Sequence, residues 1–164
     1  MMKISVVCHG NIARSQVLHH YITKYALEAG LAVEVFSCGT ASWDAYPNAE
    51  ALLAEVQREL EKRGVMGAVV RNVLDDSARG ELENSDTVLA ADQGIKDEVL
   101  KALQREQDRK KVSLFYEYIG EGTIDFVDTY DSKANEQDPA RFARCFDELE
   151  RIAEKVVRAV KENI

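Results

Sequence analysis

The sequence predicts an open α/β fold, in which a parallel sheet of four strands carries helices on both faces. Two patterns indicate it: short runs of apolar, largely β-branched residues, and between them segments in which apolar residues recur at helical spacing. Of the 164 residues, 46% are apolar and 30% are charged, as in an ordinary globular protein. That length suits one hydrophobic core, so we expect a single domain over residues 1–164.

The strands are expected in four apolar runs, at residues 3–7, 33–37, 87–91 and 112–115. Helices are expected at residues 15–29, between Asn48 and Gly64, through Ile95 to Leu103, and from Asp138 towards the end of the chain. The last helix carries one apolar stripe that should lie on the sheet. Ligands of such sheets bind beyond the C-terminal ends of the strands, so a site is expected in the loops there.

Charge and cysteine content exclude several classes of partner. The formal net charge of −8 disfavours broad binding to nucleic acid or to an anionic membrane, which both need a positive surface. The N-terminal apolar run is too short for a secretory signal, and no stretch approaches the ~20 apolar residues that span a bilayer. Three cysteines without a Cys-x-x-Cys pair argue against disulfides and zinc. We expect a cytoplasmic protein with free thiols and no cofactor.

The segment after the first expected strand carries the clearest chemistry. Cys8 follows that strand directly, and Arg14 stands six positions later at the start of the expected helix. Backbone N–H groups that converge at a helix N-terminus bind phosphate, because unpaired donors and the positive helix end act together. The planar guanidinium of Arg14 can hold two phosphate oxygens. This segment is therefore expected to bind phosphate or a similar oxyanion.

The same positive surroundings favour the thiolate form of Cys8, which is the nucleophilic form of a cysteine. Gly10 allows close backbone approach, Asn11 can fix the loop through its side chain, and Ser15 can donate its hydroxyl to the sulfur. The pattern Cys-x5-Arg alone is weak evidence, since about one chain in five of this composition would contain it by chance. Its place between a strand and a helix favours a catalytic loop over an inert buried thiol.

The loop resembles the signature of the low-molecular-weight protein tyrosine phosphatases, approximately V-C-x-G-N-x-C-R-S-P, which here reads V-C-H-G-N-I-A-R-S-Q at residues 7–16. Residues 37–40 (S-C-G-T) are similar to the family's S-A-G-T, and residues 88–92 (V-L-A-A-D) are similar to its L-A-M-D. The resemblance covers nearly the whole chain. It implies one phosphatase-like domain whose sheet has the strand order 2-1-3-4.

In that family a phosphocysteine forms while an aspartate, usually followed by proline, protonates the leaving phenolate and later activates water. The resemblance implies Cys8 as nucleophile, Arg14 as phosphate clamp and a phosphotyrosine-containing protein as substrate. It implies a phosphate-binding loop made of His9, Gly10, Asn11, Ile12, Ala13, Arg14 and Ser15.

The general acid is expected in the acidic stretch 117–138. Asp138-Pro139 is the only Asp-Pro pair, but Asp at the N-cap and Pro at the first position of the last helix explain it. Asp128 is favoured because it follows the fourth strand at suitable spacing and precedes Tyr130, an aromatic residue that can flank a substrate ring. The alternatives left open are Asp125 and Asp131.

The resemblance also suggests the walls of the substrate pocket. Trp43 falls where an aromatic residue lines the family's pocket, and His9 would lie at the pocket mouth or on the surface. Ile12 stands where a smaller Thr accompanies phosphoarginine specificity in related enzymes, so an apolar residue favours phosphotyrosine. The two remaining histidines, His19 and His20, are expected on the surface of the first helix.

The cysteines raise the question of redox protection. Ala13 stands where many relatives carry a second Cys that pairs with the nucleophile and guards it from overoxidation. Cys38 ends the second strand, beside the first, and is a candidate redox partner of Cys8. Cys145, on the last helix, is expected to serve packing.

Three other functions share parts of this pattern. Arsenate reduction uses the same loop, often with Ser-Gln after the Arg, but needs relay cysteines that residues 86–100 lack. A non-catalytic binder of phosphate or phosphopeptides would keep the loop and Arg14 while losing the acid. A sugar-transport subunit that is phosphorylated on cysteine has a similar loop but does not need Arg14.

Overall fold

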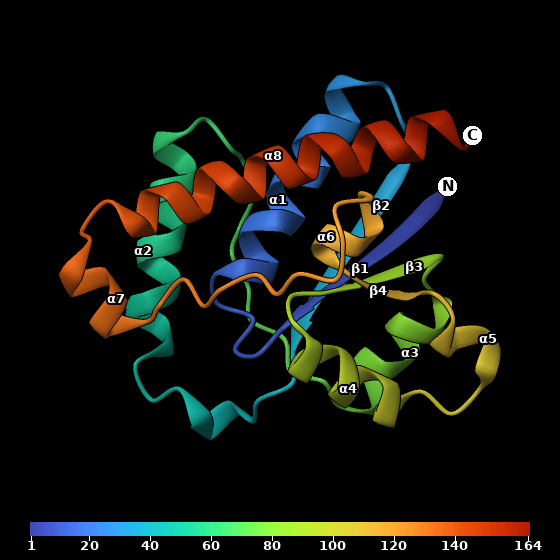
Figure 1. Cartoon of the computed structure of the whole chain (residues 1–164), viewed down its shortest axis with the longest axis horizontal. Helices are drawn as coiled ribbons and strands as arrows, with labels where there is room; N and C mark the ends of the chain where they lie inside the picture. Colours follow the sequence, from blue (N-terminus) through green and yellow to red (C-terminus); the bar gives the residue numbers. More distant parts are fainter.

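The computed structural model describes residues 1–164 and contains one parallel sheet (Figure 1). Its strands are β1 (Met2–Cys8), β2 (Val33–Gly39), β3 (Thr87–Ala90) and β4 (Val112–Leu114). They lie in the order β2-β1-β3-β4, and all three neighbouring pairs are parallel. The predicted fold class and strand order are thus confirmed.

The helices that the apolar periodicity predicts are all present, with five further short elements. The helices are α1 (Arg14–Glu28), α2 (Ala49–Lys62), α3 (Asp76–Asn84), α4 (Gln93–Ala102), α5 (Glu106–Arg109), α6 (Phe115–Tyr118), α7 (Ser132–Gln137) and α8 (Arg141–Glu162), with a 3-10 turn η1 at Trp43–Ala45. The sequence gives little sign of α3 and α7. Helix α3 buries only Ala78 and Leu82, and α7 buries no residue. Neither sequence therefore shows apolar residues that recur at helical spacing.

The sheet separates two apolar clusters. On one face α1, α6 and α8 pack together with residues such as Ile4 and Leu89, and α2 adds Val56 and Leu60. On the other face α3 and α4 cover Val7 and its neighbours. Figure 1 shows α1 and α8 on one side of the strands and α3 and α4 on the other. This is the expected arrangement of helices on both faces.

The start of the last helix differs from the prediction. Helix α8 begins at Arg141 with Ala140 as its N-cap, so the assignment of Asp138 as N-cap and Pro139 as first residue is wrong. The reason is the unpredicted α7, which ends at Gln137 with Asp138 as its C-cap. A turn in which the Arg141 N–H donates to the Asp138 carbonyl at 3.0 Å then leads into α8.

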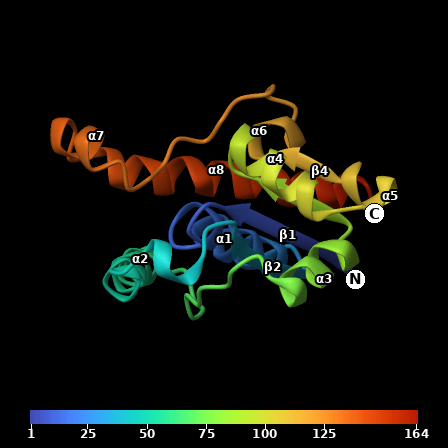
Figure 2. The same cartoon turned by 90° about the horizontal axis from the view of Figure 1, so that it is seen from below.

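The strand order reverses between β1 and β3, and this reversal opens a crevice at the C-terminal end of the sheet. Cys8 is the last residue of β1, so the fold places it at this crevice. The long segment from α6 to α7 runs back across the molecule, and in both views it leads to the end where α2 and α7 lie (Figure 1, Figure 2). The two termini lie at the opposite end.

The prediction that His19 and His20 lie on the helix surface is wrong. His20 is buried, because the turn after α2 covers it, and a Cβ added at Gly67 would lie 2.7 Å from its Nδ1. His19 is largely enclosed and its Nδ1 lies 3.0 Å from Ser37 Oγ of β2. The two rings stack at 4.6 Å. Burial lowers the pKa of His19 to about 4, and the neighbouring His20 adds to the effect.

Stability should therefore fall in mild acid. A histidine held neutral in the folded state costs nothing above the ordinary pKa of 6.5, and destabilises the fold as the pH drops from 6.5 towards 4. Between pH 6.5 and 5 the free energy of unfolding in urea should decrease more steeply in the wild type than in His19→Gln, by up to about 1 kcal/mol per pH unit. The exposed His9, changed to Gln, is the control and should keep the wild-type slope. Equal slopes in wild type and His19→Gln would contradict this account.

Candidate active site

The phosphate loop, residues 8–15, joins β1 to α1 and rests on the end of β2. The N–H of Thr40 donates to the carbonyl of Cys8 at 3.0 Å, so the pairing of the two strands continues into the loop. Gly39 lies against the loop, where a Cβ would come within 2.6 to 2.7 Å of backbone atoms of residues 9–11. Only a glycine lets the two backbones come this close.

Several backbone donors of the loop remain free. The N–H groups of Gly10, Ile12 and Ala13 donate to no backbone carbonyl, and the loop leads directly into the N-terminus of α1. Free donors beside the positive end of a helix can together hold an oxyanion.

Asn11 fixes the shape of the loop. It is the one non-glycine residue with a positive φ, 54°, and it is completely buried. Its Oδ1 accepts from the N–H of Asn72 at 2.7 Å and from Gln16 Nε2 at 3.1 Å, and its Nδ2 donates to Ser15 Oγ at 2.7 Å. These hydrogen bonds offset the cost of the left-handed backbone, which is about 1–2 kcal/mol.

Two hydrogen bonds reach the sulfur of Cys8. The N–H of Asn11 donates to Sγ at 3.2 Å, and Ser15 Oγ lies 3.0 Å from it. Because Ser15 Oγ already accepts a hydrogen bond from Asn11, its own proton is available for the sulfur. Both donors therefore favour a thiolate at Cys8, which is 2% exposed.

Arg14 is held at the other end of the loop. Its Nη1 donates to Asp92 Oδ2 and to the carbonyl of Phe126, both at 2.9 Å. Burial by itself would lower the pKa of Arg14, but the negative charges of Cys8, Asp92 and Asp128 outweigh it and raise that pKa. The guanidinium stays charged and its position is fixed before a ligand binds.

These groups meet in a small cavity of about 70 Å³. Its lining residues are Cys8, Gly10, Ile12, Ala13, Arg14, Tyr46, Asp128 and Tyr130. Of the other residues predicted to bind phosphate, Asn11 and Ser15 do not line the cavity and are fully buried. His9 lines an adjoining open groove instead. The cavity thus brings together the residues predicted as nucleophile, phosphate clamp and favoured acid, which are Cys8, Arg14 and Asp128.

The three candidate acids occupy different environments. Asp128 is the one of them that lines the cavity. Asp125 Oδ1 accepts from the N–H of Gln93 at 2.9 Å, at the start of α4. Asp131 caps α7, with Oδ1 accepting from the N–H of Ala134 at 3.0 Å. Asp125 and Asp131 therefore have local structural partners outside the cavity.

The loop around Asp128 needs no proline to hold it. Thr129, where the family usually has proline, is fully buried. Arg141 of α8 donates to the carbonyls of Asp128 and Thr129 at 2.5 and 3.3 Å. Asp128 Oδ1 accepts from the N–H of Tyr130 at 3.0 Å, which is a local turn. The start of α8 thus replaces the rigidity that a proline would give.

The structure does not place Trp43 in the cavity wall, as the resemblance suggested. Trp43 is 56% exposed and lies outside, whereas Tyr46, three residues later, lines the cavity. The 3-10 turn at Trp43–Ala45 brings Tyr46 inward. A Cβ on Gly10 would lie 2.9 Å from the Tyr46 ring, so ring and loop are in close contact. The sequence hinted at this only through two aromatic residues in one turn.

Reasoning from the sequence also missed the supports of the loop. Gln16 Nε2 donates to the carbonyl of Val70 at 2.6 Å, and Arg71 Nε donates to the carbonyl of Gly10 at 2.9 Å. Asp92 anchors Arg14 and also caps α4 through the N–H of Ile95 at 2.8 Å. Except for Asp92, which ends a family-like motif, no local pattern marks these residues.

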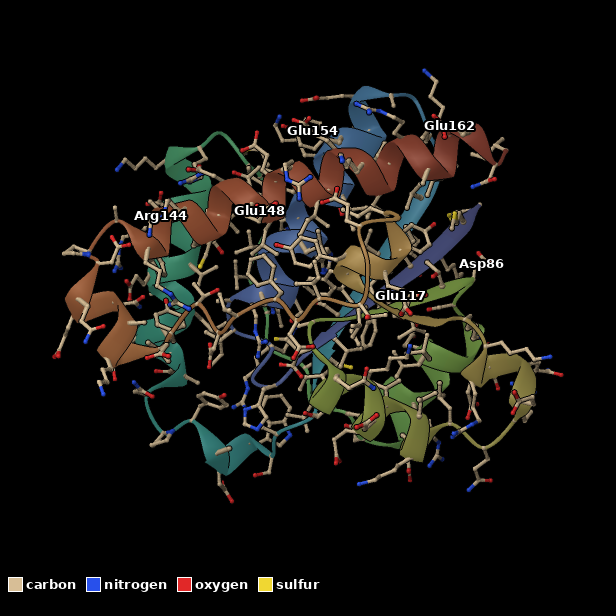
Figure 3. All side chains as sticks on the ribbon, viewed as in Figure 1. Asp86, Glu117, Arg144, Glu148, Glu154 and Glu162 are labelled. Atoms are coloured by element: carbon tan, nitrogen blue, oxygen red, sulfur yellow. The ribbon has the colours of Figure 1, made fainter.

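A larger groove adjoins the cavity, and a second groove adjoins the first. One, of about 930 Å³, includes Arg14, Asp92 and Asp128 and forms the open approach to the cavity. The other, of about 630 Å³, lies between the α6–α7 segment and α8, where Arg144 and Glu148 lie (Figure 3). Cys145, expected to serve packing, is buried and lines this second groove.

Cys38 is not placed to pair with Cys8. In the register of the sheet Cys38 lies beside Val7 and shares its apolar cluster, whereas Cys8 belongs to the cluster on the opposite face. Burial raises the pKa of Cys38 to about 12, and negative charge on Cys8 adds to this. Cys38 is therefore a packed, unreactive thiol.

The family follows from a comparison of the whole sequence with family models. The model of the low molecular weight phosphotyrosine protein phosphatases matches residues 3–164. The chain belongs to this family. The sequence resemblance is thus confirmed, and the chain is a phosphatase by family.

Solved structures of the family superpose on the chain. A low molecular weight protein tyrosine phosphatase from Bacillus subtilis is 27% identical, with 98% of each chain covered and a TM-score of 0.73. The YwlE arginine phosphatase, solved as a Cys-to-Ser mutant with a phosphorylated active-site serine, is 25% identical, with 98% of this chain and 96% of that chain covered and a TM-score of 0.77.

A protein tyrosine phosphatase from Entamoeba histolytica, 23% identical, supports the fold with a TM-score of 0.77 over 99% of this chain and 97% of that one. The sequence has no match among curated proteins. None of the helices is both long and apolar enough to cross a membrane.

The contact between Gly39 and the phosphate loop gives a direct test of the site. Gly39→Ala should weaken the binding of orthovanadate about tenfold or more, because a Cβ there must displace loop backbone, at about 1–3 kcal/mol. Isothermal titration calorimetry measures the affinity. Gly80→Ala is the matched control: a Cβ there meets nothing within 4 Å, so affinity should not change. Undiminished affinity in a folded Gly39→Ala protein would contradict this assignment.

Proposed function

We propose that the chain hydrolyses phosphotyrosine in proteins, and small aryl phosphates, through a phosphocysteine on Cys8. The observation that carries the proposal is the cavity in which Cys8, Arg14 and Asp128 meet below the free N–H groups of the loop. A nucleophile, a phosphate clamp and a proton donor are the three groups that this reaction needs. The reducing cytoplasm, where the free thiols would persist, is the proposed location.

In the first step the Cys8 thiolate attacks phosphorus and the S–P bond forms as the P–O bond to the phenol breaks. The loop N–H groups and Arg14 hold the phosphoryl oxygens and stabilise their charge in the transition state. Asp128, at the cavity wall, gives its proton to the departing phenol oxygen. The phenol leaves neutral, and Asp128 is left as a carboxylate.

In the second step a water molecule attacks the phosphorus of the phosphocysteine. Asp128 accepts a proton from that water, and the S–P bond breaks. Inorganic phosphate leaves, and Cys8 returns to the thiolate, which Asn11 N–H and Ser15 stabilise. The proton taken up by Asp128 restores it for the next cycle.

The walls of the cavity support an aryl substrate. Tyr46 and Tyr130 offer two rings and Ile12 an apolar side chain. Tyr130 is fixed by packing against Phe142 at 5.6 Å and by donating from its hydroxyl to the carbonyl of Leu52 at 3.3 Å. A phenyl ring between such walls buries apolar surface and stacks on their faces.

Phosphoarginine is the second candidate substrate, because one structural neighbour is an arginine phosphatase of 25% identity. The carboxylate of Asp128 could accept hydrogen bonds from a guanidinium as readily as it protonates a phenol oxygen. The ratio of kcat/KM for phosphotyrosine and phosphoarginine peptides of otherwise equal sequence decides between the two. A ratio below one would assign the site to phosphoarginine.

Two other readings have less support. Arsenate reduction needs a relay thiol, and Cys38 lies on the opposite face of the sheet from Cys8. A non-catalytic binder would not need an acid, whereas Asp128 lines the cavity in a loop held by Arg141. A wild-type protein that binds vanadate but hydrolyses no phosphate ester would favour the non-catalytic binder instead.

The nucleophile is tested by trapping. Cys8→Ser should lower hydrolysis of 4-nitrophenyl phosphate by a factor of about 10³ or more, since the thiolate forms the covalent intermediate. In wild type, rapid acid quench and mass spectrometry should find phosphate on the Cys8 peptide. Cys145→Ser, a buried thiol outside the cavity, is the control and should keep its activity. Phosphate on another residue would refute the assignment.

The acid is tested through the leaving group. Asp128→Asn should lower kcat about 10²-fold for phosphotyrosine, whose phenolate is a poor leaving group, and far less for 4-nitrophenyl phosphate. Asp125→Asn and Asp131→Asn, which have structural partners, should show no such dependence. If one of these variants shows the dependence and Asp128→Asn does not, the acid lies there instead.

A further inference from the structure

A short segment behind the phosphate loop has no part in the proposed reaction, yet three consecutive residues of it bind the loop. The carbonyl of Val70 accepts from Gln16 at 2.6 Å, Arg71 donates to Gly10, and the N–H of Asn72 donates to Asn11 Oδ1 at 2.7 Å. The segment is itself tied to the end of β2, where the N–H of Gly39 donates to the Asn72 carbonyl at 2.9 Å. It forms a rigid support for the loop.

Arg71 is the unusual member of this segment. It is 8% exposed, and its guanidinium donates to three backbone carbonyls, those of Gly10 at 2.9 Å, Trp43 at 3.0 Å and Ser42 at 2.8 Å. No carboxylate forms an ion pair with it, in contrast to Arg14. Its charge is balanced only by carbonyl dipoles and by two aromatic faces, so it adds positive potential behind the loop.

One peptide group links Arg71 to the nucleophile. The carbonyl of Gly10 accepts from Arg71 Nε, and the N–H of the same peptide, that of Asn11, donates to Cys8 Sγ at 3.2 Å. A trans peptide is planar and its C=O and N–H point in opposite directions, so a hydrogen bond on one side fixes the direction of the other. A cationic donor on the carbonyl also polarises the peptide and strengthens the bond to the sulfur.

Arg71 also holds the wall of the cavity. Its guanidinium carbon lies 5.4 Å from the centre of the Tyr46 ring and 5.2 Å from that of Trp43. The Tyr46 hydroxyl lies 2.5 Å from His9 Nδ1, so the ring is fixed from both sides while its edge rests on Gly10. Arg71 itself does not line the cavity.

From these contacts we infer that Arg71 is a positioning residue, which aims the Asn11 N–H at the Cys8 sulfur and holds Tyr46 as a wall of the substrate cavity. The inference rests on the proposed role of Cys8 as nucleophile. Arg71 acts through a peptide and a ring, and does not touch the substrate. Its loss should therefore change both the ionisation of the thiol and the binding of the aryl group.

The variants Arg71→Met and Arg71→Lys test this, with Arg58→Met, an exposed arginine of α2, as control. Alkylation of Cys8 by iodoacetamide is followed against pH by mass spectrometry of its peptide. In Arg71→Met the rate of alkylation at neutral pH should fall about tenfold, because the Asn11 N–H is no longer aimed at the sulfur. Arg71→Lys keeps the charge without the planar fork, so its loss should be smaller, about threefold. Arg58→Met should match the wild type.

The same variants should bind substrate less well. With the Tyr46 wall loosened, KM for 4-nitrophenyl phosphate should rise about fivefold in Arg71→Met, the value of one aromatic contact. Thermal unfolding of each variant checks that it is folded. If Arg71→Met does not fold, the test is made with Arg71→Lys. A folded Arg71 variant with wild-type alkylation and wild-type KM overturns the inference. Because alkylation needs no turnover, it still tests Arg71 if the wild type proves not to hydrolyse phosphate esters.

Discussion

The site depends on the left-handed backbone of Asn11. This conformation turns the chain so that the N–H of Asn11 reaches the Cys8 sulfur. The hydrogen bonds of the Asn11 side chain offset the cost of the conformation, and one of them sets the direction of the Ser15 hydroxyl. A smaller or apolar side chain would leave the half-buried N–H of Asn72 without its acceptor, although Gln16 would keep the carbonyl of Val70. The same side chain of Asn11 therefore both offsets the backbone strain of the loop and satisfies its surroundings.

A protein of net charge −8 has to concentrate positive potential to hold an anion. Positive charge is concentrated at the phosphate loop by two buried guanidiniums, Arg14 at the end of the loop and Arg71 behind it, and by the N-terminus of α1. Arg14 is balanced by Asp92, which fixes it, whereas Arg71 has no acid beside it. In the proposed mechanism Arg14 meets the ligand, and Arg71 raises the electrostatic potential at the loop.

A feature could be predicted from the sequence where its contacts join residues that are close together along the chain. The last five residues of strand β1 are all buried, and the loop follows directly along the chain, so both leave local patterns in the sequence. These patterns predict the fold, which is confirmed, and a candidate nucleophile. No local spacing predicts that Tyr46 lines the cavity or that Arg71 supports the loop, because both lie far from the loop along the chain. The burial of His20 is equally hidden, because the turn at Gly67 that covers it lies far from α1 in sequence. The polar α7, with nothing buried, shifted the expected start of the last helix.

The chain contains one tryptophan, and its position gives the molecule a built-in optical signal. Trp43 is half in solvent, with its ring over the guanidinium of Arg71 and its carbonyl bonded to the same group. Any movement of the loop that is passed to Arg71 changes the charge and the water around the indole, and so its emission. Intrinsic fluorescence of the unlabelled protein therefore reports such a movement without a chromogenic substrate.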